Sequence, residues 1–89
     1  MSLKRSENKK AVNRAVDLCD SQYQKKGLWY QQDCIQGVNI LRRVVRRGVS
    51  VHNAERAARL VCINLNDSPG PRGRCQMGVR MLAANLKRK

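Results

Sequence analysis

The chain has 89 residues, enough for one small domain, and 19 lysines and arginines against 6 acidic residues give it a formal net charge of +13. Hydrophobic residues make up 42% of the sequence, which excludes a fully disordered chain. No run approaches the roughly 18 apolar residues of a membrane-spanning helix, and no apolar segment follows the basic start as it would in a secretory signal. We therefore expect an intracellular protein, in the cytoplasm, nucleus or nucleoid, with no membrane partner.

The first predicted element is a helix over residues 8–26. Its apolar residues recur at i, i+4, i+7 and i+11, which places them on one helix face: Val12, Val16, Cys19 and Tyr23. Lys25 and Lys26 suit the negative end of a helix dipole, and Gly27 is typical of the position just past a helix end. We expect residues 1–7 to form a flexible basic N-terminus.

The second predicted helix covers residues 29–47. It repeats the same spacing, with Cys34, Val38, Leu41 and Val45 on one face. Gly37 inside it is either a weak point of the helix or a place where another helix approaches closely. Gly48 suits the end of the helix.

The third predicted helix covers residues 51–65 and follows a short turn in which Ser50 can cap it, with Asn53 as the competing cap. Residues 66–74, Asn-Asp-Ser-Pro-Gly-Pro-Arg-Gly-Arg, predict a loop. A fourth helix over 75–86 follows, and residues 87–89 form a basic tail. The pattern predicts an all-α fold, a small bundle of about four amphipathic helices in one domain over 8–86. A homodimer would add apolar burial to so small a domain.

The four cysteines, at 19, 34, 62 and 75, contain no CxxC pair, and His52 is the only histidine, so a zinc site is poorly supported. Each cysteine falls on or beside an apolar stripe. We expect buried, reduced thiols, with two disulfides as the alternative if the protein is secreted.

The positive charge is concentrated in the second half of the chain. Residues 42–89 hold twelve basic and two acidic residues, and most of the basic ones are arginines, whose planar guanidinium suits phosphate. Arg42, Arg43, Arg46 and Arg47 fall within an arc of roughly 140° of the second helix, nearly opposite its apolar stripe. This pattern predicts a phosphate-binding face, with a merely solvated basic face as the alternative.

The segment from Ile40 to Val61, two helices joined by Gly48-Val49-Ser50, resembles the helix-turn-helix family. The resemblance implies that the third helix reads a major groove, Asn53 pairing with adenine and Arg56 with guanine, and that Arg59 is exposed beside them. The sequence departs from the family at three positions: Val44 stands where the first helix has a small residue, and Ala54 and Ala57 stand where the second has branched apolar residues.

The sequence Pro71-Arg72-Gly73-Arg74 resembles the centre of an AT-hook, without that family's following proline. The resemblance implies that Arg72 and Arg74 enter a narrow minor groove. The alternative is an ordinary loop that leads into the fourth helix, where Arg72 and Arg74 could clamp a phosphate with Arg80.

No constellation of acid, base and nucleophile is evident, so we expect no enzymatic activity, no cofactor and no metal. We predict a nucleic-acid-binding protein that grips duplex DNA or double-stranded RNA, of the transcription-regulator, RNA-silencing-suppressor or nucleoid type, as in small viral or phage proteins. Two alternatives remain open. One is an assembly factor with a basic docking face, and the other is a secreted, membrane-active helical protein with two disulfides.

Overall fold

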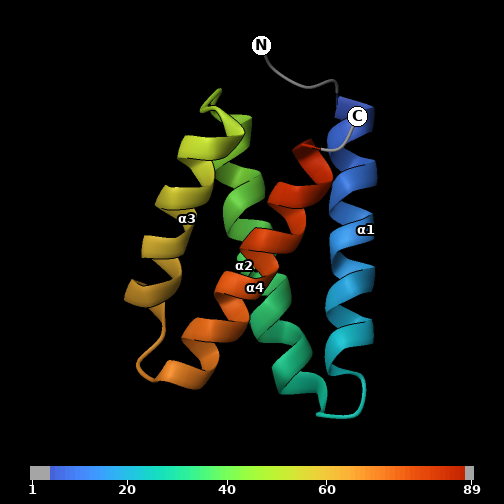
Figure 1. The fold of residues 1–89 in the computed structure, drawn as a ribbon, viewed down its shortest axis with the longest axis vertical. Coiled ribbons are helices and arrows are strands. Elements are labelled where there is room, and N and C mark those ends of the chain that lie inside the picture. The colour runs from blue at the N-terminus through green and yellow to red at the C-terminus, as the bar shows by residue number, and fades with distance from the viewer. Residues whose placement is uncertain (1–4, 88–89) are drawn as a thin grey trace.

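The computed structural model describes residues 5–87, with side chains from residue 8 onward, and contains four α-helices and no strand over that range. The helices, which Figure 1 shows in chain order, are α1 (Arg5–Tyr23), α2 (Leu28–Arg46), α3 (Val51–Leu65) and α4 (Pro69–Lys87). The predicted all-α bundle of four amphipathic helices is confirmed. Of the predicted flexible ends, residues 1–4 and 88–89 lie outside the described part, whereas residues 5–7 and 87 are helical.

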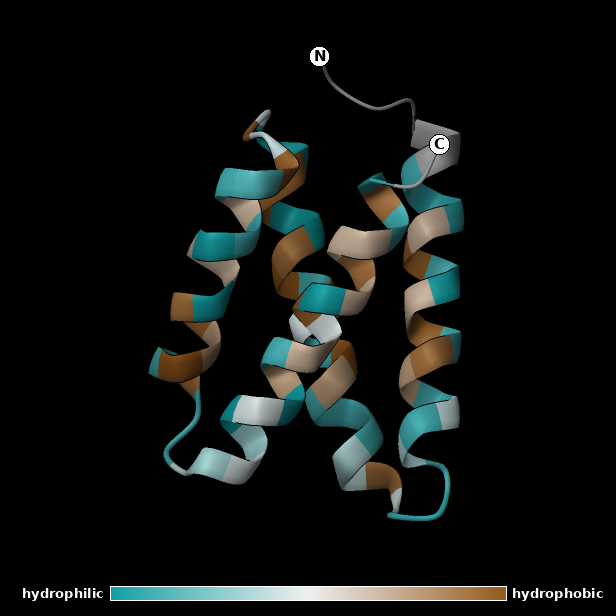
Figure 2. Ribbon diagram, viewed as in Figure 1, coloured by the Kyte–Doolittle hydropathy of each residue, from teal (hydrophilic) through white to brown (hydrophobic). Residues whose placement is uncertain are grey.

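The four helices form two hairpins, α1–α2 and α3–α4, whose second helices cross at the centre of the molecule (Figure 1). Both α1 and α3 pack against α2 and α4, whereas α1 and α3, on opposite flanks, do not pack against each other. Figure 2 shows the apolar positions of α1 turned mainly toward the neighbouring helices, whereas the second half of α3 also carries apolar positions on its outer side. None of the helices within 5–87 is long and apolar enough to cross a membrane.

The two hairpins carry the same sequence pattern. The first helix of each hairpin carries Ala-x3-Ala-x3-Cys, which ends at Cys19 in α1 and at Cys62 in α3. The second helix carries Cys-x2-Gly-Val-x2-Leu, over 34–41 in α2 and 75–82 in α4. All of these residues are buried, so the repeat defines the core of each hairpin. The two hairpins are therefore related by an approximate twofold arrangement.

The crossing of α2 and α4 depends on two glycines, Gly37 and Gly78. A methyl group on Gly37 would overlap the carbonyl group of Cys75, and one on Gly78 would overlap the carbonyl group of Cys34. Of the two alternatives for Gly37, the close approach of another helix is thus correct. The reciprocal contact brings the two backbones together, so that Val38 and Val79 beside the glycines are fully buried.

The prediction of reduced thiols is wrong, because the four cysteines form two disulfides, Cys19–Cys34 and Cys62–Cys75, each with a Cα–Cα distance of 5.6 Å. All four are fully buried, as expected. The buried stripe of each first helix faces that of its partner, which places the two cysteines of a hairpin opposite one another. The thioether sulfur of Met81 in α4 lies 3.9 Å from both sulfurs of the first disulfide. Disulfides are typical of oxidising environments, including the cell exterior and virion surfaces, and are rare in the cytosol, so they count against the expected intracellular location.

Two predicted helix boundaries are also wrong. Residues 69–74 form the first turns of α4 rather than a loop. Pro69 and Pro71 are compatible with this because the first N–H groups of a helix have no partner within it. Helix α1 ends at Tyr23, so Lys25 and Lys26 lie in the turn that leads to Gly27, whose φ is +115°.

Candidate nucleic-acid interface

The arginine cluster, which we define as Arg42, Arg43, Arg46 and Arg47, occupies the last turns and the C-terminal cap of α2. All four side chains are exposed. On the other side of the same helix, Val38 and Leu41 are fully buried against the core. The helix therefore separates a rigid core face from a guanidinium face, as its sequence predicts.

The arginine cluster has no ion-pair partner among the side chains of residues 8–87. The ion pairs in that range join Arg74 to Asp33, and Arg59 and Lys87 to Glu55. The nearest acidic residues in sequence, Asp33 and Glu55, thus neutralise other cations. The positive charge of the cluster is left for an external anion.

The start of α3 lies at the same end of the molecule as the arginine cluster, because only a short turn separates the two helices (Figure 1). Ser50 caps α3 as predicted, and its hydroxyl oxygen accepts a hydrogen bond from the backbone N–H of Asn53 at 3.4 Å. Asn53, Arg56 and Arg59 are exposed, as a reading helix requires. Arg59 lies 3.7 Å from Glu55, whereas Arg56 has no ion pair within the described chain.

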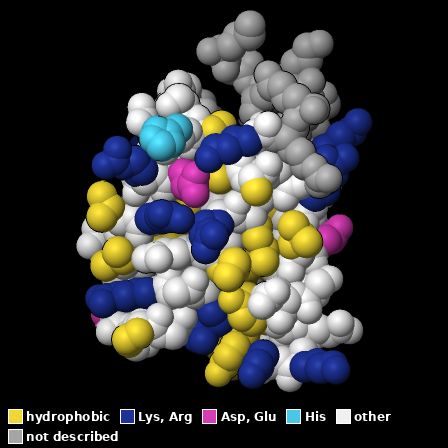
Figure 3. Space-filling model, viewed as in Figure 1, with side chains coloured by type: hydrophobic (Ala, Val, Ile, Leu, Met, Phe, Trp, Pro, Cys, Tyr) yellow, Lys and Arg dark blue, Asp and Glu magenta, His cyan; other side chains and the backbone are white. Residues whose placement is uncertain are grey.

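Lys and Arg side chains also gather over α3 on the face that Figure 3 draws. Arg56 and Arg59 are exposed on α3, and Arg59 shares the carboxylate of Glu55 with Lys87 of α4, which places Arg59 on the side of α3 next to α4.

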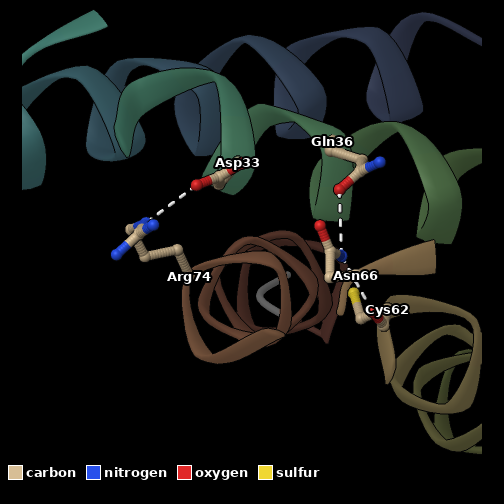
Figure 4. Close-up of polar contacts among 5 residues, drawn as sticks. All are labelled: Asp33, Gln36, Cys62, Asn66 and Arg74. Atoms are coloured by element: carbon tan, nitrogen blue, oxygen red, sulfur yellow. Dashed lines mark hydrogen bonds and ion pairs between the residues drawn. The ribbon is translucent and has the colours of Figure 1, made fainter. Parts of the chain in front are cut away.

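Arg72 binds within the protein rather than projecting into solvent. Its Nε donates hydrogen bonds to the backbone carbonyls of Asn66 at 2.6 Å and Ile63 at 3.1 Å. These carbonyls belong to the end of α3, where helical partners run out. The Asn66 side chain reinforces the same end, because its Nδ2 donates to the carbonyl of Cys62 at 2.8 Å and to Oε1 of Gln36 at 3.3 Å (Figure 4).

Arg74 is held between two partners. Its Nε lies 2.8 Å from a carboxylate oxygen of Asp33 (Figure 4), and its guanidinium carbon lies 3.9 Å above the ring of Tyr30. Arg72 and Arg74, both in the predicted binding set, thus link α4 to α3 and α2. The AT-hook resemblance does not extend to the structure, because residues 72–74 are helical and not an extended strand that could lie in a minor groove.

A groove beside α1 and α4 is mostly apolar, and it is lined by Leu18, Met77, Arg80, Met81, Ala84 and Asn85. Over the described residues, no group of three His, Cys, Asp or Glu side chains could hold a metal ion.

The side chain of Trp29, at the start of α2, is 78% exposed. An apolar residue next to a predicted stripe is ordinarily assigned to the core, so its type alone did not signal a surface position. Its neighbour Tyr30 packs near Tyr23, with ring centroids 6.2 Å apart.

Comparison of the chain with family models, curated proteins and solved structures gives no match.

Proposed function

We propose that this protein binds nucleic acid and grips the phosphates of duplex DNA or double-stranded RNA through the arginine cluster of α2. The observation that carries the proposal is four exposed arginines without an internal acidic partner in the described chain, backed by the buried side of the same helix. Like charges this close destabilise a free helix, and phosphates would relieve the repulsion. A regulatory role, in transcription, RNA silencing or the nucleoid, is part of the proposal, although the two disulfides are typical of oxidising environments rather than of those compartments.

The contribution of α3 to the proposed interface is base reading by Asn53 and Arg56. Both side chains are exposed, and neither needs to break an ion pair of the described chain to contact a base. Arg72 and Arg74 are left out of the proposed interface because their hydrogen bonds hold helices together.

Salt-resolved titration tests the proposal. Labelled duplex DNA, duplex RNA and single strands are titrated with the protein, oxidised and intact, at several salt concentrations. Four phosphate contacts on B-DNA predict that log K falls with log[salt] with a slope of about −3.6, at about −0.9 per contact. Replacing the four cluster arginines by glutamine should remove most of this slope.

A matched control removes the same charge elsewhere. Lys9, Lys10, Arg14 and Arg80 are exposed and lie outside the cluster, so their replacement by glutamine should leave most of the slope in place. Equal flattening in both variants would mean that binding follows net charge rather than the cluster. Absence of saturable binding near ~50 mM salt would refute the function itself.

A second candidate function is favoured by the two disulfides. Small, cationic, disulfide-bonded helical proteins fit an extracellular setting, where anionic membranes are the corresponding polyanion. Release of a dye from vesicles of phosphatidylglycerol and phosphatidylcholine, at protein concentrations that do not bind duplex, would favour this candidate over the first.

A further inference from the structure

We propose that Trp29 forms a stacking site for an unpaired nucleobase, so that the protein prefers a junction between duplex and single strand to a continuous duplex. The inference rests on the proposed nucleic-acid function and adds a second contact to it. It concerns the end of α2 opposite the arginine cluster.

Trp29 is the most exposed of the aromatic residues in the chain. Its side chain is 78% exposed, whereas Tyr30 is engaged by Arg74 and packs near Tyr23. A flat, exposed indole at a helix start carries no packing role that would explain it. Stacking on an aromatic ring is how proteins hold unpaired bases, because every base has a π-face.

Trp29 lies on the same outward face of α2 as the arginine cluster. Positions 29, 32, 39, 43 and 46 follow helical spacing, and all five residues are exposed: Trp29, Gln32, Asn39, Arg43 and Arg46. The face between the indole and the guanidinium groups is polar and carries no exposed apolar side chain. One strand of nucleic acid can therefore follow the helix from one end to the other.

The length of α2 sets the register of such a strand. Trp29 and Arg43 are fourteen residues apart, or about 21 Å along the helix axis at about 1.5 Å per residue. At about 3.4 Å per nucleotide step, this distance equals about six steps of a duplex strand. A base stacked on Trp29 would then lie about six nucleotides from the phosphates held by the cluster.

The charge around Trp29 also suits a strand. Lys25 and Lys26 are exposed in the turn that precedes α2, and the nearby carboxylate of Asp33 is already paired with Arg74. A phosphate next to the stacked base would meet the two lysines. Electrostatic contact and stacking together are the usual means of single-strand binding.

A lipid surface is the competing occupant, because Leu28 beside Trp29 is 64% exposed. The other exposed aliphatic residues lie outside α2: Leu18 is on α1, Val49 is in the turn after α2, and Leu60, Ile63 and Leu65 are on α3. The surface that continues from Trp29 along α2 is polar and then basic, which favours a polyanionic strand over an apolar layer. We therefore commit to the nucleobase and use vesicles as the contrasting probe.

Trp29 is the only tryptophan, so its fluorescence reports on this site alone. The oxidised protein is titrated with a blunt duplex, the same duplex with a single-stranded tail, and vesicles of phosphatidylglycerol and phosphatidylcholine, while anisotropy of labelled duplexes gives affinities. We expect the tailed duplex to quench the fluorescence, the blunt duplex to leave it nearly unchanged, and the tail to improve affinity at least about fivefold. Trp29→Leu should abolish the gain from the tail and leave blunt-duplex affinity unchanged, whereas Trp29→Tyr should keep part of the gain.

Equal affinity for tailed and blunt duplexes, with the fluorescence unaffected, would overturn the stacking site while leaving the duplex function intact. A blue shift with vesicles and no quenching by the tailed duplex would assign the site to lipid instead. Failure of both duplexes to bind at low salt would overturn the proposed function and this inference with it.

Discussion

Replacing Gly78 by alanine should destabilise the protein, although alanine ordinarily strengthens a helix. A methyl group there would overlap the carbonyl group of Cys34, and the obstacle is backbone, which cannot rotate away as a flexible side chain would. Relief requires α2 and α4 to separate at their crossing, where Val38, Leu41, Val79 and Leu82 are fully buried. Overpacking costs about 1–3 kcal/mol, and the rigid backbone places this site at the upper end, about 3 kcal/mol.

The gain in helix propensity from glycine to alanine is about 1 kcal/mol, which leaves a net loss of about 2 kcal/mol. For a domain of this size, that loss lowers Tm by about 8–16 °C. Gly73 in α4 provides the matched control, because it is exposed and a methyl group there would meet nothing within 4 Å. Gly73→Ala should raise the stability by up to about 1 kcal/mol.

Thermal unfolding followed by circular dichroism, with both disulfides intact, measures the difference between the two variants. We expect Tm to fall for Gly78→Ala and to rise for Gly73→Ala, and Gly37→Ala should behave as Gly78→Ala does. If Gly78→Ala melts at or above the Tm of the unsubstituted protein, the close approach of α2 and α4 is not a feature of the folded protein in solution.

Two further predictions concern covalent and ionic links between helices. Replacing Cys62 and Cys75 together by alanine should lower the free energy of unfolding by about 3 kcal/mol, because the disulfide closes a loop with a sequence separation of 13. Urea unfolding measures this loss. A loss below ~1 kcal/mol would mean that the disulfide barely constrains the unfolded chain. Arg74→Gln should cost about 1 kcal/mol, less at high salt, because its pair with Asp33 is partly exposed. The same variant should leave the salt slope of duplex binding unchanged, and a slope flatter by ~0.9 would return Arg74 to the interface.

The helices and their buried faces could be predicted because a 3.6-residue period appears directly in the sequence. Val38, Leu41, Val79 and Leu82 all lie where the spacing places them. The start of α4 could not be predicted from the sequence, because Pro69 is compatible both with a loop and with the first turn of a helix, where its missing N–H costs no hydrogen bond. Local chemistry alone does not separate these two possibilities.

The pairing of the cysteines depends on which helix faces meet, and the spacing of cysteines along the chain does not contain that information. A comparison of the chain with itself would have helped, since Cys34 and Cys75 share the pattern Cys-x2-Gly-Val-x2-Leu and each pairs with the cysteine of a preceding Ala-x3-Ala-x3-Cys. Two equivalent hairpins suggest two equivalent bonds. The signal for the pairing is therefore the internal repeat of the sequence and not the cysteine spacing alone.

The sequence alone could not separate the predicted arginines that are free to bind phosphate from those that are bound within the protein. The arginine cluster could be predicted to lie on the surface, because the helical spacing places it on the side of the helix opposite the buried residues Val38 and Leu41. Arg72 and Arg74 looked equally available in sequence, and only the positions of Asn66, Asp33 and Tyr30 show that the protein itself binds them. Arginine content identifies candidates for phosphate contact, but tertiary partners decide which of them are free.

Each disulfide lies within one hairpin, so no covalent cross-link joins the two halves of the molecule. Apart from the chain itself, which passes from α2 to α3 through residues 47–50, the halves are held by noncovalent packing, centred on the two crossing glycines. If that connection straightened, the α3–α4 hairpin of one molecule would find the same complementary surface on the α1–α2 hairpin of another. The architecture thus contains a route to a domain-swapped dimer in which every disulfide stays intact and the arginine clusters of the two chains flank the exchanged connections.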